Sequence, residues 1–216
     1  MESFLELELP PTSSKSRSYY FDRNSAINAT LYCNGQPSYT IMTNKSGTRT
    51  DVCDIATQSV VATIKRREVF ADTIKFPARN NGASVAINKW LRPITHSPYH
   101  AEPSILLVTD VGNFVWESDA AHRLALYAEE DHHVPVAFFS RNKQPQDAIV
   151  LVVKSSAEEM VEDVIVSFII LEQRLRMKEK RRQNGMMPPR HTFFTSCASG
   201  RPLLAPHCIP THLRVI

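Results

Sequence analysis

The sequence lacks the patterns that usually mark an active site. It has six glycines in 216 residues, too few to expect a Gly-rich phosphate loop, and it contains no G-x-S-x-G nucleophile elbow. Its four cysteines show no CxxC spacing, and no Cys/His motif surrounds Cys33 or Cys53, so free thiols are expected rather than a disulfide framework. These absences predict a protein that is not an enzyme and that binds neither a cofactor nor a metal ion.

Long apolar runs are also missing. The longest uncharged apolar run, 164–171, is eight residues, whereas a membrane-spanning helix needs about 20. Residues 1–18 include three glutamates and no apolar stretch, so no secretory signal peptide is expected. The net charge of +3 is too small to indicate nucleic acid as a partner by itself. We therefore expect a cytoplasmic protein, with the nucleus as an alternative compartment.

The sequence does contain a series of short β-strand patterns between residues 18 and 153. Asn34-Gly35, a strong hairpin signal, lies between the expected strands 29–33 and 38–43. The expected strands are 19–21, 29–33, 38–43, 48–53, 60–66, 69–76, 84–91, 106–108, 113–117, 123–128, 134–140 and 149–153. Their regular spacing, without alternation of strands and helices, predicts an antiparallel barrel or sandwich.

One of these strands has an informative alternation. In 60–66, β-branched residues predominate, which suits a pleated surface. Ala62, Ile64 and Arg66 share one face of this strand. Val61, Thr63 and Lys65 share the other face.

A single long helix is expected after the strands, over 156–182. Ser156 followed by Glu159 matches a capping box, and Asn184-Gly185 supplies a stop. Acidic residues near the helix start and basic residues near its end both suit the helix dipole. The middle of the segment is apolar on nearly every side, unlike a surface helix. We therefore expect an antiparallel β-barrel that encloses this hydrophobic C-terminal helix.

The chain also resembles an uncharacterised fungal domain family. The resemblance covers about residues 18–182 and is carried mainly by turns and core positions. The matching segments are Asn-Ala-Thr-Leu-Tyr at 28–32 with Gly35, Tyr-Thr-Ile-Met-Thr at 39–43, Val-Ala-Thr-Ile-Lys at 61–65, Phe-Val-Trp at 114–116, and 162–168 continuing into Glu172 and Arg174.

This family is similar in organisation to the tubby C-terminal and LURP-one-related domains. The resemblance implies a closed β-barrel threaded by a hydrophobic helix, and its relatives include phosphoinositide-binding and scramblase-like proteins. No residue of a phosphoinositide pocket can be matched here, so none is transferred. The expected organisation is a flexible arm over 1–17, one domain over 18–185 with a Pro/His-rich loop insertion near 92–104, and a disordered tail over 186–216.

The candidate binding residues form a basic stretch with seven positive and two negative charges. They are Lys65, Arg66, Arg67, Lys75, Arg79, Lys89 and Arg92. Such a stretch suits anionic phospholipid headgroups or phosphates. Ordinary solvated strand faces and a hairpin tip are the simpler interpretation of the same residues.

Two further clusters carry weaker hypotheses. The run 129–133, Glu-Glu-Asp-His-His, offers metal-ligand residue types, but adjacent residues on a strand point in opposite directions, so a solvated loop is favoured. The basic run 174–182 suits a nuclear or nucleic-acid role, although solubilising the end of the helix is the simpler explanation.

The sequence thus predicts a non-enzymatic intracellular binding or scaffold domain of unknown ligand. Contact with anionic lipid headgroups through the 65–92 stretch is the leading hypothesis, and a protein partner is compatible with the same reasoning. A nuclear or nucleic-acid-associated protein that uses 174–182 is the alternative.

Overall fold

The computed structural model describes residues 16–94, 103–118, 121–140 and 149–185. The predicted arm and the predicted tail lie outside these residues, except that Ser16 and Arg17 already belong to the first strand. The predicted loop insertion is described only at its two ends, where residues 91–94 and 104 are in strands.

The fold is mainly β, with one long C-terminal helix, as predicted. Thirteen antiparallel strands form one sheet. The first seven are β1 (Ser16–Phe21), β2 (Ala29–Cys33), β3 (Gln36–Thr43), β4 (Arg49–Asp54), β5 (Ser59–Lys65), β6 (Thr73–Lys75) and β7 (Ser84–Ala86). The remaining six are β8 (Leu91–Ile94), β9 (Ser104–Thr109), β10 (Gly112–Glu117), β11 (His122–Ala128), β12 (Ala137–Ser140) and β13 (Val150–Lys154).

The sheet consists of two meanders joined through its first and last strands. β1 to β7 follow one another on one side, β8 to β13 on the other, and β1 pairs with β13 in the middle. The Asn34-Gly35 turn between β2 and β3 is confirmed, with both residues at positive φ (53° and 76°), a conformation that this dipeptide favours.

The expected closed barrel is not formed by the described residues. β7 and β8 are the two edges of the sheet, and they do not pair with each other in this part of the chain. The residues between them fold into a single helical turn, α1 (Ile87–Trp90), in which the Leu91 N–H bonds to the Ile87 carbonyl. The Leu91 N–H therefore bonds within the helical turn, and the sheet is open between β7 and β8 in the described residues.

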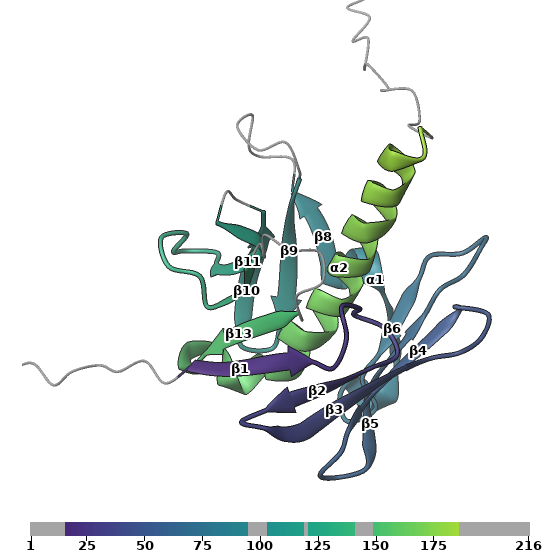
Figure 1. The fold of residues 1–216 in the computed structure, drawn as a ribbon, viewed down its shortest axis with the longest axis horizontal. Coiled ribbons are helices and arrows are strands. Elements are labelled where there is room, and N and C mark those ends of the chain that lie inside the picture. Colours follow the sequence, from purple (N-terminus) through teal and green to yellow (C-terminus); the bar gives the residue numbers. More distant parts are fainter. Residues whose placement is uncertain (1–15, 95–102, 119–120, 141–148, 186–216) are drawn as a thin grey trace, which may run out of the picture.

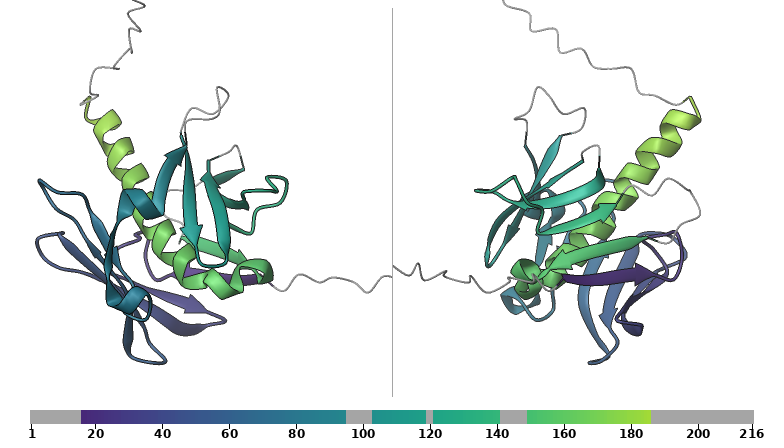
Figure 2. Two further views of the ribbon diagram at one scale, coloured as in Figure 1. Left: turned by 180° about the vertical axis from the view of Figure 1, so that it is seen from behind. Right: turned by 60° about the vertical axis from the view of Figure 1, so that its left-hand side comes forward.

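The long helix α2 (Val161–Gln183) lies between the two meanders (Figures 1 and 2). Every residue from Asp163 to Glu172 is buried, which confirms that the middle of the helix is enclosed. Beyond Glu172 the side chains of the helix become more exposed, and all of them are exposed from Met177 onward. Within the described residues, no helix is both long enough and apolar enough to span a membrane.

The helix start differs from the predicted capping box. Ser155–Met160 forms a 3-10 helix, and α2 begins at Val161 after Met160, which makes no side-chain capping bond. Ala157 and Met160 are buried, so packing against the core fixes the entry to the helix. The acidic first turn and basic last turn are present as expected.

Two strand predictions are also wrong in extent. The expected strand over 69–76 is reduced to β6, because Asp72 closes a loop before it: its carboxylate accepts the Arg67 N–H, and its carbonyl accepts the Ile87 N–H. The expected strand over 84–91 is divided by α1 into β7 and the start of β8.

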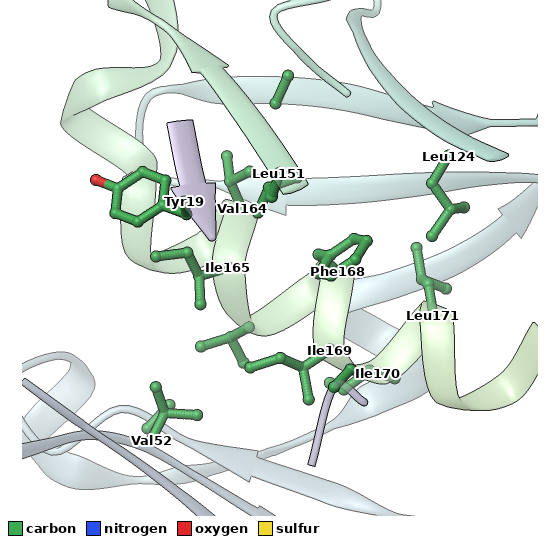
Figure 3. Packing of buried hydrophobic residues seen from close by; sticks show 14 of the residues in the cluster. Tyr19, Val52, Leu124, Leu151, Val164, Ile165, Phe168, Ile169, Ile170 and Leu171 are labelled. Carbon is green, nitrogen blue, oxygen red and sulfur yellow. The ribbon is translucent and has the colours of Figure 1, made fainter. Parts of the chain in front are cut away.

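Phe168 lies at the centre of the core. Its ring contacts Phe21 of β1, Phe139 of β12 and Trp116 of β10, at centroid distances of 5.7, 5.4 and 6.5 Å. Figure 3 shows Phe168 and its neighbours on α2 between the strands that carry Leu124 and Leu151 and the strand that carries Val52. One aromatic ring thus joins both meanders to the helix.

We expect Phe168→Ala to lower the free energy of unfolding by about 3–5 kcal/mol, because it removes a fully buried ring and leaves a cavity. Denaturant unfolding measures this loss. Met177→Ala, a truncation of an exposed side chain on the same helix, should change stability by about 0.5 kcal/mol or less. Equal losses in the two variants would contradict an enclosed helix.

Candidate basic site at the end of the fold

The seven basic residues predicted as a site fall into two groups. Lys65, Arg67, Lys75, Lys89 and Arg92 have exposed side chains. Arg66 and Arg79 are partly buried and turn toward α2. The structure therefore divides one stretch of sequence into surface charges and charges that hold the helix in place.

Arg66 connects the end of β5 to the helix. Its Nη1 donates to the Gly47 carbonyl at 3.2 Å and to the Thr50 hydroxyl at 3.0 Å, and its Nη2 donates to Oε1 of Gln173. Ala62 and Ile64 are buried on the same face of β5, as the predicted alternation requires. Arg66 is thus the inward-facing residue at the end of a buried strand face.

Arg79 connects the loop after β6 to the first turn of α2. Its Nη1 lies 2.8 and 2.7 Å from the two carboxylate oxygens of Asp163, its Nη2 lies 3.3 Å from Glu162, and its guanidinium covers the Phe76 ring. Asp163 is 2% exposed, and burial raises the pKa of its carboxyl although Arg79 acts in the opposite direction. Arg79 therefore compensates a buried charge.

The two arginines act at distant points of the helix. Asp163 and Gln173 are ten residues apart, which corresponds to about 15 Å along an α-helix. A pocket of about 200 Å³ does bring Arg79 and Lys89 together, but Asp110 and Asp163 also line it. The predicted residues therefore do not form one binding pocket for an anion.

Two of the exposed charges, Lys65 and Lys75, lie on the same face of the sheet. Lys65 pairs with Arg49 across β4 and β5, and Lys75 lies opposite Thr63, on the same face as Lys65. Arg49 bonds to Asp51 at 2.9 Å, so one of these charges is neutralised. The outer face carries a modest positive charge near the end of β5.

The most exposed apolar side chains of the described chain lie next to these charges. In the loop between β5 and β6, Val69 is 86% exposed and Phe70 is 72% exposed. Both were expected on a strand, so sequence reasoning missed them as surface residues. The signal was present in the flanking charges: Arg66, Arg67 and Glu68 on one side and Asp72 on the other are more typical of a loop than of a buried strand.

The basic end of α2 lies on the same side of the molecule as this loop. In Figures 1 and 2, the β5–β6 loop and the C-terminal half of α2 extend from the same end of the fold. The charge of Arg174 is close enough to Arg66 to lower its pKa, in addition to the larger effect of burial. Two stretches that are about 100 residues apart in sequence thus contribute charge to one end of the molecule.

The acidic and histidine cluster at 129–133 lies in the loop between β11 and β12, as favoured from the sequence. Asp131 accepts the His133 N–H at 2.9 Å, and the His132 ring stacks on Tyr127. In the described ranges, no group of three His, Cys, Asp or Glu side chains is arranged to hold a metal ion.

Removing the Arg79 side chain should destabilise the fold in a pH-dependent way. We expect Arg79→Gln to cost about 3–5 kcal/mol near neutral pH, because Asp163 is left buried and unpaired. Because burial raises the folded-state pKa of Asp163, its ionisation costs stability as the pH rises through that value. The deficit should therefore shrink as the pH falls from 7 toward 4 and Asp163 becomes neutral.

Denaturant unfolding of Arg79→Gln and the parent protein across this pH range measures the deficit. Lys75→Gln removes an exposed charge from the neighbouring strand, so it should change the free energy of unfolding by about 0.5 kcal/mol or less at every pH. A deficit that stays constant with pH would show that Asp163 is not the group that Arg79 compensates.

Comparisons with known proteins identify a family without a known activity. No curated protein matches the chain. An X-ray structure of a protein from Arabidopsis thaliana is similar, with 12% sequence identity and a TM-score of 0.45, over 74% of this chain and 91% of that one. The family of unknown function DUF6593 matches residues 24–177, from the turn before β2 to the exposed part of α2. The chain belongs to this family, DUF6593.

Proposed function

We propose that this protein is a non-enzymatic intracellular binding domain that attaches to anionic phospholipid surfaces through the β5–β6 loop. The observation that carries the proposal is the exposure of Val69 and Phe70 at the tip of that loop, shortly after the basic residues 65–67. Exposed aromatic side chains are costly in water and are frequent at interaction surfaces.

The loop has a stable base and a projecting tip. Its base is held by the bond from the Arg66 N–H to the Thr48 carbonyl and by the two bonds that Asp72 accepts from Arg67 and Ile87. Its tip makes no comparable bond among the described residues. Because the base is already fixed, the ends of the loop lose little further conformational freedom when the tip enters a headgroup layer.

The expected affinity is modest. Transferring a Phe or Val side chain from water into an apolar layer contributes about 1.5–3 kcal/mol each, and each basic residue near an anionic surface adds about 1 kcal/mol. Lys65 and Arg67 flank the tip, whereas Glu68 opposes them. These contributions support reversible, salt-sensitive attachment rather than permanent anchoring.

We further propose a fold relationship to the tubby C-terminal and LURP-one-related domains. Its support is the hydrophobic C-terminal helix enclosed by antiparallel strands, although the closed barrel that the resemblance implies is not formed by the described residues. The fungal origin implied by the same resemblance stays a prediction, as does a cytoplasmic location.

Vesicle flotation at low ionic strength tests the lipid proposal. The protein should float with phosphatidylcholine vesicles that contain phosphatidylserine and much less with phosphatidylcholine alone. We expect Val69→Ser/Phe70→Ser to weaken flotation by at least about tenfold, because it removes the apolar contribution of the tip.

Val134→Ser provides a matched control, since Val134 is also exposed but lies in the loop between β11 and β12. It should float like the parent protein. Unchanged flotation of the tip variant, or no flotation of the parent protein with anionic vesicles, would rule the lipid proposal out.

The alternative, a nucleic-acid role of 174–182, is favoured by the exposure of Arg174, Lys180 and Arg181 on the part of α2 that leaves the sheet. The same preparations can be titrated with duplex DNA. Binding that is lost in Arg181→Gln but retained in the tip variant would support the alternative instead.

A further inference from the structure

A pocket at the end of the sheet combines five polar side chains with an apolar wall. Its volume is about 300 Å³, and it lies between α2, the end of β5 and the loop before β2. Its apolar surface comes from Ala26, Ile27 and Met177. Its polar side chains are Ser25, Thr43, Arg66, Gln173 and Arg176. None of its lining residues is an Asp or a Glu.

Gln173 has an unusual position in this pocket. Its Oε1 accepts from Arg66, but its Nε2 is buried and has no hydrogen-bond partner in the part of the chain that the structure describes. A buried donor without an acceptor costs about 1–3 kcal/mol, so native proteins rarely leave one unpaired. Gln173 thus lies beside Arg66 in the wall of the pocket and adds no negative charge there.

Arg66 and Arg176 also have guanidinium N–H groups that make no hydrogen bond within the described residues. Arg66 uses both Nη1 hydrogens and one on Nη2, which leaves Nε–H and one Nη2 hydrogen with no acceptor among the described residues. Arg176 donates from Nε to Glu172 at 2.6 Å and from its two Nη atoms to Asn24 at 2.9 and 2.6 Å. One hydrogen on each Nη of Arg176 therefore also has no acceptor among the described residues.

These donors are held in place by the fold rather than by one another. Arg176 is fixed by Glu172 and by the loop before β2, and Arg66 is fixed by the turn between β3 and β4. Burial lowers the pKa of Arg66, while Asp72 acts in the opposite direction and Arg174 lowers it further. Neither Asp72 nor Glu172 lines the pocket.

We propose that this pocket binds a small amphiphilic anion, a carboxylate or phosphate on a short alkyl body. Its oxygens accept hydrogen bonds from the unused donors of Arg66 and Arg176. Its alkyl part packs against Ala26, Ile27 and Met177. Guanidinium groups suit such oxyanions because they present several donors in one plane. This site is separate from the β5–β6 loop tip and does not depend on the proposed lipid attachment.

Titration of the full chain with octanoate and octyl phosphate, followed by NMR, tests the proposal. Binding of either probe should shift the side-chain amide signals of Gln173, whereas octanol, which has the same alkyl body without the charge, should bind at least tenfold more weakly. The relative affinity of the two anions distinguishes a carboxylate from a phosphate as the preferred group.

Gln173→Glu tests the anion site most directly. It keeps the oxygen that accepts from Arg66 but replaces the unpaired donor by a second acceptor with negative charge. We expect it to weaken octanoate binding at least tenfold while the protein stays folded. Gln36→Glu makes the same change at an exposed amide at the far end of β3, and it should bind octanoate like the parent protein.

Two results would overturn the inference. Equal binding of octanoate and octanol would show an apolar groove without an anion site. Retained binding by Gln173→Glu, or no shift of the Gln173 amide with either anion, would show that this pocket is not an anion site. The variant Val69→Ser/Phe70→Ser should bind octanoate normally, so failure of vesicle attachment and failure of this site are separate outcomes.

Discussion

The burial of α2 is the constraint on which the rest of the structure depends. A helix that is apolar on nearly every side cannot lie on a surface, so both meanders must cover it. Its middle also carries Asp163, Ser167 and Glu172, all buried. Each of these polar groups needs a partner from the surrounding strands, because an unpaired buried polar group or charge costs several kcal/mol.

Those partners fix the helix to separate parts of the sheet. Arg79 pairs with Asp163 near the start of α2, and the Trp116 ring N–H donates to the Ser167 hydroxyl at 3.0 Å in the middle. Glu172 accepts from Arg123 of β11 at 2.8 Å and from Arg176 on its own helix. Arg123 also forms a two-bond pair with Glu179, which extends the attachment toward the exposed end. Polar contacts therefore set the position of the helix, and apolar burial supplies most of the stability.

This arrangement explains why the basic residues have unequal functional value. A guanidinium that neutralises a buried carboxylate, as in Arg79, is not available to a ligand without loss of stability. Arg66 and Arg176 are intermediate, since each is held by the protein and each retains unused donors beside a pocket. Lys65 and Arg67, beside the tip of the β5–β6 loop, have exposed side chains and neutralise no buried charge, so they can bind a ligand without loss of stability.

The sequence predicted local structure better than it predicted whether the sheet closes into a barrel or how the site residues are arranged. Alternation in β5, the Asn34-Gly35 turn and the apolar middle of α2 are local signals, and each was confirmed. Whether β7 meets β8 depends on how the whole sheet curves, which no local pattern encodes. The exposure of Phe70 was missed because the apolar pair Val69-Phe70 was weighed above the charged residues on both sides of it, which are typical of a loop. Gln173 carries no sequence signal, since its role depends on contact with Arg66, about 100 residues away.

Amide hydrogen exchange of α2 tests the central claim most directly. If the middle of the helix is the core of the fold, amides from Asp163 to Glu172 should exchange only through global unfolding, with protection close to the full unfolding free energy. Amides beyond Lys178 and in the β5–β6 loop should exchange much faster. Protection of the 163–172 amides no greater than that of the exposed helix end would contradict an account in which the sheet is built around this helix.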